Sequence, residues 1–246
     1  MPPERRSLVR SKQSGNEGNS VRKKEKPRSL CRSVANDEDL KSILTSISDP
    51  TLDQYRITVP NASIYYIPEL IEDEISCRWY ENLLNLPTWY RPTLKVYGKS
   101  IVQSRKIAVY THNPDYEVKY SGTTVKPHTD YPSVISSIQD LVEQRLGVQF
   151  THVMLNRYDS GDVYIGLHAD SLENSVIATV SLGVERTFIM RHRTIKGEKG
   201  IRKWKLRNGS LFVMQGQTQR FWKHEIPKEP KITGGRISLT FRLVGF

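Results

Sequence analysis

Three side chains able to bind one metal ion lie in two short segments of this sequence. His168 and Asp170 follow an apparent β-type run that ends near Tyr164, and His224 lies in the run 220–226. Residues i and i+2 of an extended segment point to the same side, so His168 and Asp170 can converge on one ion. Two histidines and one carboxylate form the ligand set of non-haem iron(II) oxygenases. Because H-x-D spacing is common by chance, this pattern alone leaves an ordinary structural role open.

The C-terminal run 236–244 alternates polar and apolar side chains, as a β-strand does. Its polar side is formed by Arg236, Ser238, Thr240 and Arg242. An edge strand with this side in water would show the same alternation. In a central strand the two arginines would lie inside the fold, where a guanidinium needs a carboxylate or phosphate partner. They are about 20 Å apart along the strand, so a small dicarboxylate would meet both only through long side chains.

Composition narrows the class of protein. The chain has 246 residues, a formal net charge of +11 and 37% hydrophobic residues. These values allow one substantial core and favour polyanionic partners. No apolar run approaches the roughly 18 residues that span a bilayer, and the N-terminus lacks the apolar centre of a signal peptide. We therefore expect a soluble intracellular protein without membrane contact.

Other common site chemistries have little support in the sequence. The two cysteines, Cys31 and Cys77, provide neither a disulfide framework nor a thiolate metal cluster. No phosphate-binding loop, dinucleotide fingerprint or nucleophile elbow is present. The remaining histidines have no comparable partner, and we expect them at ordinary surface or core positions: His112, His128, His152 and His192.

The first 50 residues have the composition of a basic disordered tail. Positions 1–32 contain ten basic and three acidic residues, and no apolar periodicity is sustained. The cluster from Arg22 to Arg28 is typical of a nuclear-import or nucleic-acid-tethering segment, and a merely solvated end is the alternative. The remainder, 51–246, is expected to form one domain.

Within that domain the pattern changes from helical to β-type. Apolar residues recur at helical spacing in Pro68–Leu86 and Pro132–Leu146, and Gly147 stands at the C-cap position of the second helix. Short β-type runs follow at 149–158, 176–184, 186–192, 202–206, 210–214, 220–226 and 236–244. Two covering helices followed by seven strands predict an α+β fold built on a jelly roll, that is, a double-stranded β-helix.

Several motifs together resemble the AlkB family of iron(II)- and 2-oxoglutarate-dependent dioxygenases. In order they are Leu155-Asn-Arg-Tyr-Asp159, His168-x-Asp170, Val180-Ser-Leu-Gly183, Arg186-Thr-Phe188, His224 and Arg236-x-Ser-x-Thr-Phe-Arg242. Three further segments are most similar to the nuclear branch that repairs double-stranded DNA: Val96-Tyr-Gly-Lys99, Ser104-Arg-Lys106 and Tyr120-Ser-Gly122. The likeness runs from about residue 94 to the end of the chain.

The resemblance implies an iron site and a cosubstrate site. It makes His168, Asp170 and His224 the ligands of Fe(II). It implies that 2-oxoglutarate is bound by Asn156, Tyr158, Arg236, Ser238, Thr240 and Arg242. AlkB members usually have Asn where Ser238 stands, a departure that concerns the orientation of the cosubstrate.

The resemblance also implies contacts with a flipped base. Tyr120 would stack on the base opposite His168, and Tyr97 would fill the gap left in the duplex, with an ordinary turn tyrosine as the alternative. The other implied substrate contacts are Gly98, Lys99, Arg105, Val118 and Ser171. Two departures concern this pocket. Ser171 and Leu172 replace acidic residues, with Glu173 one place later, and Val118 replaces an aromatic residue.

The activity implied by the resemblance is DNA repair by oxidative demethylation. The expected substrates are bases of the 1-methyladenine and 3-methylcytosine type in DNA, double-stranded by preference, and the expected enzyme is a nuclear monomer. The basic stretch 191–207 fits a duplex partner, and a solvated hairpin is its alternative. Two other functions stay open: an AlkB-like oxygenase acting on RNA or protein, and a non-catalytic nucleic-acid-binding jelly roll.

Overall fold

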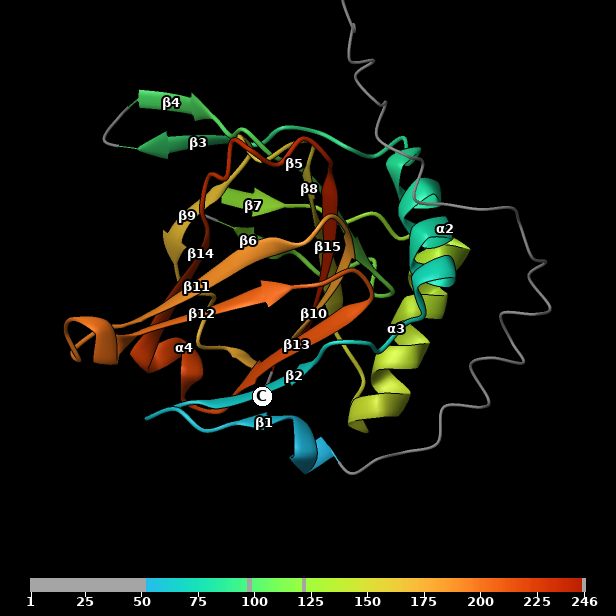
Figure 1. Ribbon diagram of the computed structural model, residues 1–246. Helices are drawn as coiled ribbons and strands as arrows, with labels where there is room; N and C mark the ends of the chain where they lie inside the picture. Colours follow the sequence, from blue (N-terminus) through green and yellow to red (C-terminus); the bar gives the residue numbers. More distant parts are fainter. Residues whose placement is uncertain (1–51, 97–98, 121–122, 245–246) are drawn as a thin grey trace, which may run out of the picture. The chain divides into compact units, whose positions relative to one another are not determined.

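The computed structural model describes residues 52–96, 99–120 and 123–244, and these residues are built mainly from two antiparallel β-sheets (Figure 1). The larger sheet contains, in spatial order, β1 (Arg56–Ile57), β2 (Ser63–Ile67), β13 (Ser210–Gln215), β10 (Asn174–Gly183), β15 (Arg236–Val244), β8 (His152–Tyr158) and β5 (Lys106–Thr111). The smaller sheet contains β12 (Ile201–Leu206), β11 (Arg186–His192), β14 (Trp222–Ile226) and β9 (Ile165–His168). The predicted tail, 1–50, lies outside the described residues.

Two helices cover the outer face of the larger sheet. They are α2 (Asp73–Leu84) and α3 (Ser133–Leu146), which lie side by side against it (Figure 1). Their apolar stripes join the apolar side of β15 in one core cluster that includes Trp79, Ile138, Leu239 and Phe241. A second apolar cluster, which includes Met190, Phe212 and Trp222, fills part of the space between the two sheets. The predicted α+β jelly roll with covering helices is thus confirmed.

Strand β15 lies between β10 and β8, so the exposed-edge alternative for its polar side is wrong. Its alternating residues divide between the helix-covered core and the space between the sheets. The pairing register aligns four inward rows: Arg236 with Tyr158, Ser238 with Ser181 and Asn156, Thr240 with Thr179 and Met154, and Arg242 with His152. One face of three neighbouring strands therefore carries most of the polar groups named from the sequence.

The structure corrects several predicted boundaries. Helix α2 begins at Asp73 instead of Pro68, because the backbone N–H groups of Leu70 and Ile71 both donate to the carbonyl of Gly209 (3.0 Å). The second helix was predicted to within one residue, and Gly147 ends it with a left-handed φ of 66°.

The prediction of a strand that ends near Tyr164 is wrong as well. Strand β8 ends at Tyr158 and β9 begins at Ile165, and Gly161 between them exchanges backbone hydrogen bonds with the loop after β14. The run 220–226 is also divided, since residues 218–221 form the helical turn α4 (Thr218–Phe221) and β14 starts at Trp222.

Three strands of the larger sheet and two β-hairpins were not predicted. Strands β1, β2 and β5 precede the expected β region and extend the larger sheet at its two sides. The hairpins are formed by β3 (Thr93–Val96) with β4 (Lys99–Val102) and by β6 (Val118–Tyr120) with β7 (Thr123–Val125). No helix among the described residues is both long and apolar enough to cross a membrane.

Candidate metal centre and cavity

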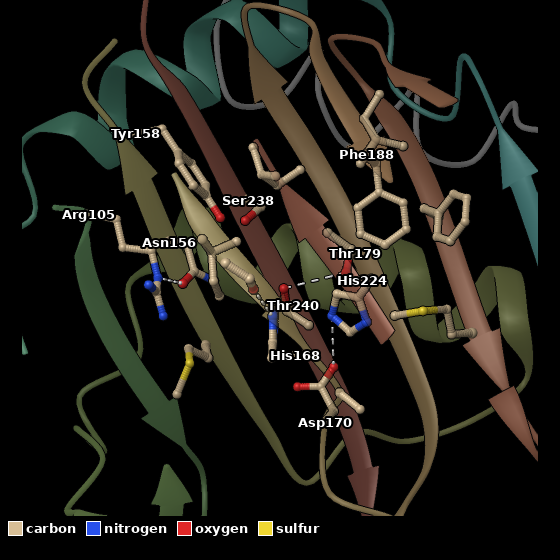
Figure 2. A pocket seen from close by; sticks show the side chains of 18 of the residues that line it. Arg105, Asn156, Tyr158, His168, Asp170, Thr179, Phe188, His224, Ser238 and Thr240 are labelled. Atoms are coloured by element: carbon tan, nitrogen blue, oxygen red, sulfur yellow. Dashed lines mark hydrogen bonds and ion pairs between the residues drawn. The ribbon is translucent and has the colours of Figure 1, made fainter. Parts of the chain in front are cut away.

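A cavity of about 360 Å³ lies between the two sheets. One wall is the polar inner face of β15 and β8, and the opposite wall includes His224 and Phe188 of the smaller sheet. Figure 2 shows Asn156, Ser238 and Thr240 directed into the same space as His168, Asp170 and His224. The jelly roll therefore brings residues from the middle and the end of the chain to one cavity.

Strands β9 and β14 place two histidines side by side at this cavity. His168 and His224 are direct partners in the antiparallel pairing, and their ring centroids are 4.3 Å apart. Nδ1 of His168 lies 2.8 Å from the carbonyl oxygen of Gly166. Because a carbonyl can only accept, Nδ1 carries the proton and Nε2 presents its lone pair. Metal-binding histidines commonly use this arrangement.

Asp170 joins the histidine pair from the turn after β9. Its Oδ2 lies 3.5 Å from Nε2 of His224, and its Oδ1 accepts a hydrogen bond from Nη2 of Arg242 (2.8 Å). The backbone N–H of Asp170 donates to Oε1 of Gln219 (2.9 Å), which ties this turn to α4. Burial alone would raise the pKa of Asp170, but the Arg242 guanidinium and the two imidazoles lower it well below its ordinary value.

The protonation states of the cluster are those that metal ligands require. Burial lowers the pKa of His224 to about 3 and also lowers the pKa of His168, so both imidazoles are neutral while Asp170 is ionised. Such groups can donate lone pairs without first losing a proton. Within the described part of the chain, no three His, Cys, Asp or Glu side chains are already assembled with full ligand geometry. The ion pair with Arg242 holds the Asp170 carboxylate instead.

Arg236, six residues along β15 from Arg242, is a buried guanidinium with unused donors. Its side chain is almost inaccessible, and Nη2 donates to Oγ of Ser181 (2.8 Å). Nε and Nη1 have no hydrogen-bond acceptor among the described residues. Burial lowers the pKa of Arg236 to about 10, which leaves it charged at neutral pH. A buried cation with two unused N–H donors fits a carboxylate group of a bound ligand.

Smaller polar groups line the wall between the two arginines. Oδ1 of Asn156 accepts a hydrogen bond from Nε of the buried Arg105 (2.8 Å), and Oγ1 of Thr179 donates to Oγ1 of Thr240 (3.4 Å) (Figure 2). The ring of Tyr158 lies under the Arg236 guanidinium, 5.4 Å from its central carbon. The wall thus offers hydrogen-bonding groups along a path from Arg236 towards Asp170.

The donor set fits iron(II) with a small dicarboxylate. Two neutral imidazoles and one carboxylate match the facial ligand set of non-haem iron sites. The unused donors of Arg236 match the distal carboxylate of a ligand such as 2-oxoglutarate, whose other end would face the histidine pair.

Most residues named from the sequence line this cavity: His168, Asp170, His224, Asn156, Tyr158, Arg236, Ser238, Thr240, Arg242, Arg105 and Ser171. Val118 is not among the described residues that line it. It is 5% exposed and packs against Ile107, Val109 and Met154, so its predicted substrate contact stays a prediction.

The remaining predicted substrate contacts are Tyr97, Gly98, Lys99 and Tyr120. Tyr97 and Gly98 are outside the described residues. Lys99 begins β4 and Tyr120 ends β6, but the structure describes only their backbone. Their predicted roles therefore stay predictions.

Two residues near the cluster were missed by sequence reasoning. His152, expected at an ordinary position, is buried beside Arg242 in the inner row, and its Nδ1 has no partner among the described residues. Its strand parity with Asn156 could have placed it on this face. Gln219 positions the Asp170 backbone from a helical turn that no local pattern predicted.

Comparison with protein families and curated proteins identifies relatives over most of the chain. Residues 63–242 match the profile of the 2OG-Fe(II) oxygenase superfamily. The DNA oxidative demethylase ALKBH2 of Arabidopsis thaliana is 30% identical over 209 residues, covering 74% of this chain and 67% of that protein. ALKBH2 of Homo sapiens is 34% identical, covering 61% of this chain and 60% of that protein. The human alpha-ketoglutarate-dependent dioxygenase alkB homolog 3 is 31% identical over 135 residues, about half of each chain.

Two solved structures share the fold. The structure of OsALKBH1 has a TM-score of 0.52 at 14% identity and covers 76% of this chain and 99% of its own. A prolyl hydroxylase from Trichoplax adhaerens, solved with a peptide fragment of a hypoxia inducible factor degradation domain, has a TM-score of 0.52 at 13% identity. It covers 84% of this chain and 91% of its own. At these identities the likeness concerns the fold alone.

Proposed function

The chain belongs to the 2OG-Fe(II) oxygenase superfamily and, within it, to the AlkB homologues, and on that premise we propose that it is a DNA repair dioxygenase. In this proposal it uses Fe(II), O₂ and 2-oxoglutarate to remove alkyl groups from DNA bases oxidatively. The observation that carries the proposal is one cavity with a histidine–aspartate cluster and, along the same strand face, a buried arginine with unused donors.

We assign the metal site to His168, Asp170 and His224. When bound, iron would let O₂ supply the oxidising power towards the alkyl C–H bond, and 2-oxoglutarate would supply two electrons as it is decarboxylated to succinate. The chain would position the metal: the imidazoles and the carboxylate would bind it on one side, and Gln219 fixes the Asp170 backbone. Phe188 also lines the cavity and gives its wall an apolar surface.

We assign the cosubstrate site to the inner face of β15 and β8. Arg236 would bind the distal carboxylate of 2-oxoglutarate through the donors that no described residue uses. Asn156 and Tyr158 would contact the cosubstrate from β8, and Thr240 from β15. Arg242 would remain beside Asp170 and balance its charge.

We propose double-stranded DNA as the preferred partner, with a monomeric enzyme acting in the nucleus. The net charge of +11 supports a polyanionic substrate. The names of the ALKBH2 relatives support DNA, and Tyr97 is the sequence's candidate for a wedge that replaces the flipped base.

One experiment tests the proposal directly. The protein is incubated with Fe(II), 2-oxoglutarate and oligonucleotides that carry the same methylated base in single-stranded DNA, duplex DNA or RNA, and the repaired base is measured by mass spectrometry. We expect repaired base in DNA, most rapidly in the duplex. Repair confined to RNA would identify an RNA demethylase, and bound oligonucleotide without succinate release would identify a non-catalytic binding module.

A further inference from the structure

His152 is a buried histidine outside the metal cluster. It is the first residue of β8 and is 4% exposed, and it is the direct partner of Arg242 in the pairing of β8 with β15. Its Nδ1 has no hydrogen-bond partner among the described residues. A buried polar atom without a partner is unfavourable and requires an explanation in a native protein.

Arg242 carries a second such atom in the same cross-strand pair. Its Nη2 donates to Oδ1 of Asp170 (2.8 Å), but its Nη1 has no acceptor among the described residues. The described pairing between this guanidinium and the carboxylate therefore uses one nitrogen, although such groups frequently pair through two parallel hydrogen bonds.

His152 can supply the acceptor that Nη1 of Arg242 lacks. Burial, followed by the charge of Arg242, lowers the pKa of His152 to about 3, so its imidazole is neutral at neutral pH. A neutral imidazole has one protonated nitrogen and one acceptor nitrogen. The ring of Tyr116 packs against this imidazole with the centroids 5.2 Å apart, which limits how far the imidazole can turn.

The pairing of Arg242 determines how much of the Asp170 carboxylate is available to a metal ion. A guanidinium that held both carboxylate oxygens would compete with the metal for each of them. In the structure, Oδ2 of Asp170 lies 3.5 Å from Nε2 of His224, and the described hydrogen bond from Arg242 goes to Oδ1. A separate acceptor for Nη1 would preserve this one-sided arrangement.

We infer that His152 is a positioning residue for Arg242: when Asp170 binds the metal, Nδ1 of His152 accepts a hydrogen bond from Nη1 and keeps Arg242 from pairing with both carboxylate oxygens. The inference rests on the metal site assigned under the proposed function. His152 is not among the described residues that line the cavity, so it acts through Arg242 and not on the metal or the substrate.

A matched pair of variants at this position separates the acceptor from the shape of the side chain. Asn and Leu have the same branched shape, and Asn keeps a hydrogen-bonding atom close to the place of the histidine Nδ1. Co(II) is titrated into the metal-free protein without 2-oxoglutarate, and its visible spectrum reports affinity and coordination. We expect His152→Asn to bind Co(II) within about threefold of wild type and His152→Leu to bind it roughly tenfold more weakly or worse, because groups that orient metal ligands typically contribute about 10–100-fold to affinity. Equal affinities of the two variants would overturn the inference.

The same pair in an Arg242→Met background tests whether His152 acts through the arginine. Without the guanidinium, we expect the Asn and Leu variants to bind Co(II) equally. A difference that persisted would show that His152 acts by another route and would overturn the inference. Since 2-oxoglutarate is omitted, a contact between Arg242 and the cosubstrate does not contribute to either result.

A second buried histidine provides the control. His192 packs against Trp222 and does not line the cavity in the described residues, so His192→Asn and His192→Leu should have equal affinities for Co(II). Melting temperatures check folding. If His152→Leu does not fold, His152→Phe replaces it, because phenylalanine keeps an aromatic contact with Tyr116 but has no acceptor, and the same loss is expected.

Metal binding and turnover distinguish this inference from the proposed function. The expected difference between the Asn and Leu variants, found in a protein that does not demethylate DNA, would support the inference and count against the proposed function alone. A wild-type protein that binds no Co(II) would overturn the inference together with the assigned metal site.

Discussion

Arg236 shows how a single buried side chain can indicate a ligand. A fully buried guanidinium is costly when its N–H groups lack acceptors, and two donors of Arg236 have none among the described residues. Its charge persists because its pKa stays near 10 despite burial. Oγ of Ser181 accepts from Nη2, so a carboxylate that reached Nε and Nη1 would stabilise the arginine as well as itself.

We therefore expect Arg236→Ala to raise the KM for 2-oxoglutarate strongly. Loss of a buried charged partner costs about 2–5 kcal/mol of binding free energy. Arg236→Lys should restore only part of the affinity, because an ammonium cannot make two parallel hydrogen bonds. The control is Arg157→Ala, since Arg157 lies on β8 but pairs outside the cavity with Asp159 (2.6 Å). An unchanged KM for 2-oxoglutarate in Arg236→Ala would show that the cosubstrate does not bind at this face.

Substitutions in the metal cluster should abolish metal binding and turnover, and not only raise the KM for 2-oxoglutarate. Asp170→Asn keeps the volume of the side chain but removes the anionic ligand, so we expect metal binding and succinate production to be abolished. His168→Gln and His224→Gln should have the same effect. Metal content after dialysis and succinate release are the measurements, and circular dichroism checks folding.

The control for the metal cluster is His192→Gln. His192 is buried against Trp222 and does not line the cavity in the described residues, so this variant should keep its metal. A full complement of iron and normal turnover in Asp170→Asn would exclude this carboxylate from the site.

Strand parity explains which site residues could be predicted from the sequence. The polar face of β15 was predicted correctly because a two-residue period depends only on the local chain. Whether that face is buried depends on the neighbouring strands, and this information is not local. The same parity applied to β8 would have placed His152 beside Asn156. Gln219 could not be found in this way, because its contact with Asp170 joins two turns that are 49 residues apart.

At the scale of elements, the sequence predicted regular segments better than their ends. Helix α3 was predicted almost completely, because Gly147 provides a left-handed cap that few other residues adopt. The start of α2 was missed because a distant carbonyl, that of Gly209, determines it. Strand β5 was not predicted although its residues are almost all buried, since short apolar runs do not distinguish a strand from a buried helix turn.

A buried ion-pair network connects the elements that carry the metal-binding residues. Arg186 is fully buried and donates to the carbonyls of Ser160, Val163 and Pro227, which precede β9 and follow β14. Glu229 accepts from Nε of Arg186 at 3.1 Å. The network therefore fixes the approach to His168 and the exit from His224 relative to β11.

This network predicts a specific acid sensitivity. Burial would raise the pKa of Glu229, but hydrogen bonds from Thr187, Lys205 and Arg186 lower it from 4.5 to about 2. Because the pKa of Glu229 is lower in the folded state, its carboxylate stabilises the fold at pH values above the unfolded-state pKa. This stabilisation is lost as the pH falls from 4.5 towards 2. Glu229→Gln should therefore lower Tm at neutral pH, and the difference from wild type should vanish in that acid range.

The control for Glu229 is Glu225→Gln, which removes the partner of the more exposed Arg191. We expect a smaller loss of Tm from it, because partly exposed ion pairs contribute little. Thermal melts of the three proteins across the acid range provide the comparison. A Tm difference between wild type and Glu229→Gln that does not change with pH would mean that the glutamate stabilises the fold by packing and not by charge.

At the scale of the whole molecule, basic residues are concentrated in the segment 191–207, which holds eight Lys or Arg residues and one acidic residue, Glu198. The segment 191–207 forms the end of β11, a short turn and β12, and it was predicted to be either a duplex contact or a solvated hairpin. Several of its cations have local partners: Arg191 pairs with Glu225, Lys205 with Glu229 and Arg207 with Glu69. Those pairs reduce the charge that the segment can offer to phosphate groups. Lys199 and Lys203 belong to the same segment, and no acid contact is described for them.

The salt dependence of DNA binding distinguishes the two interpretations of this segment. Each phosphate contact adds about 0.9 to the slope of log affinity against log salt concentration, because binding releases counterions. If Lys199 and Lys203 contact the backbone, Lys199→Gln with Lys203→Gln should reduce the slope by about two and weaken binding to methylated and unmethylated duplexes equally. The control, Arg78→Gln with Arg145→Gln, removes the same charge from the two helices that cover the other face of the larger sheet. It should change the slope much less, since net charge alone acts only at long range. Equal slopes for the two double variants would show that 191–207 is a solvated hairpin. Duplex recognition would then depend on the rim of the cavity.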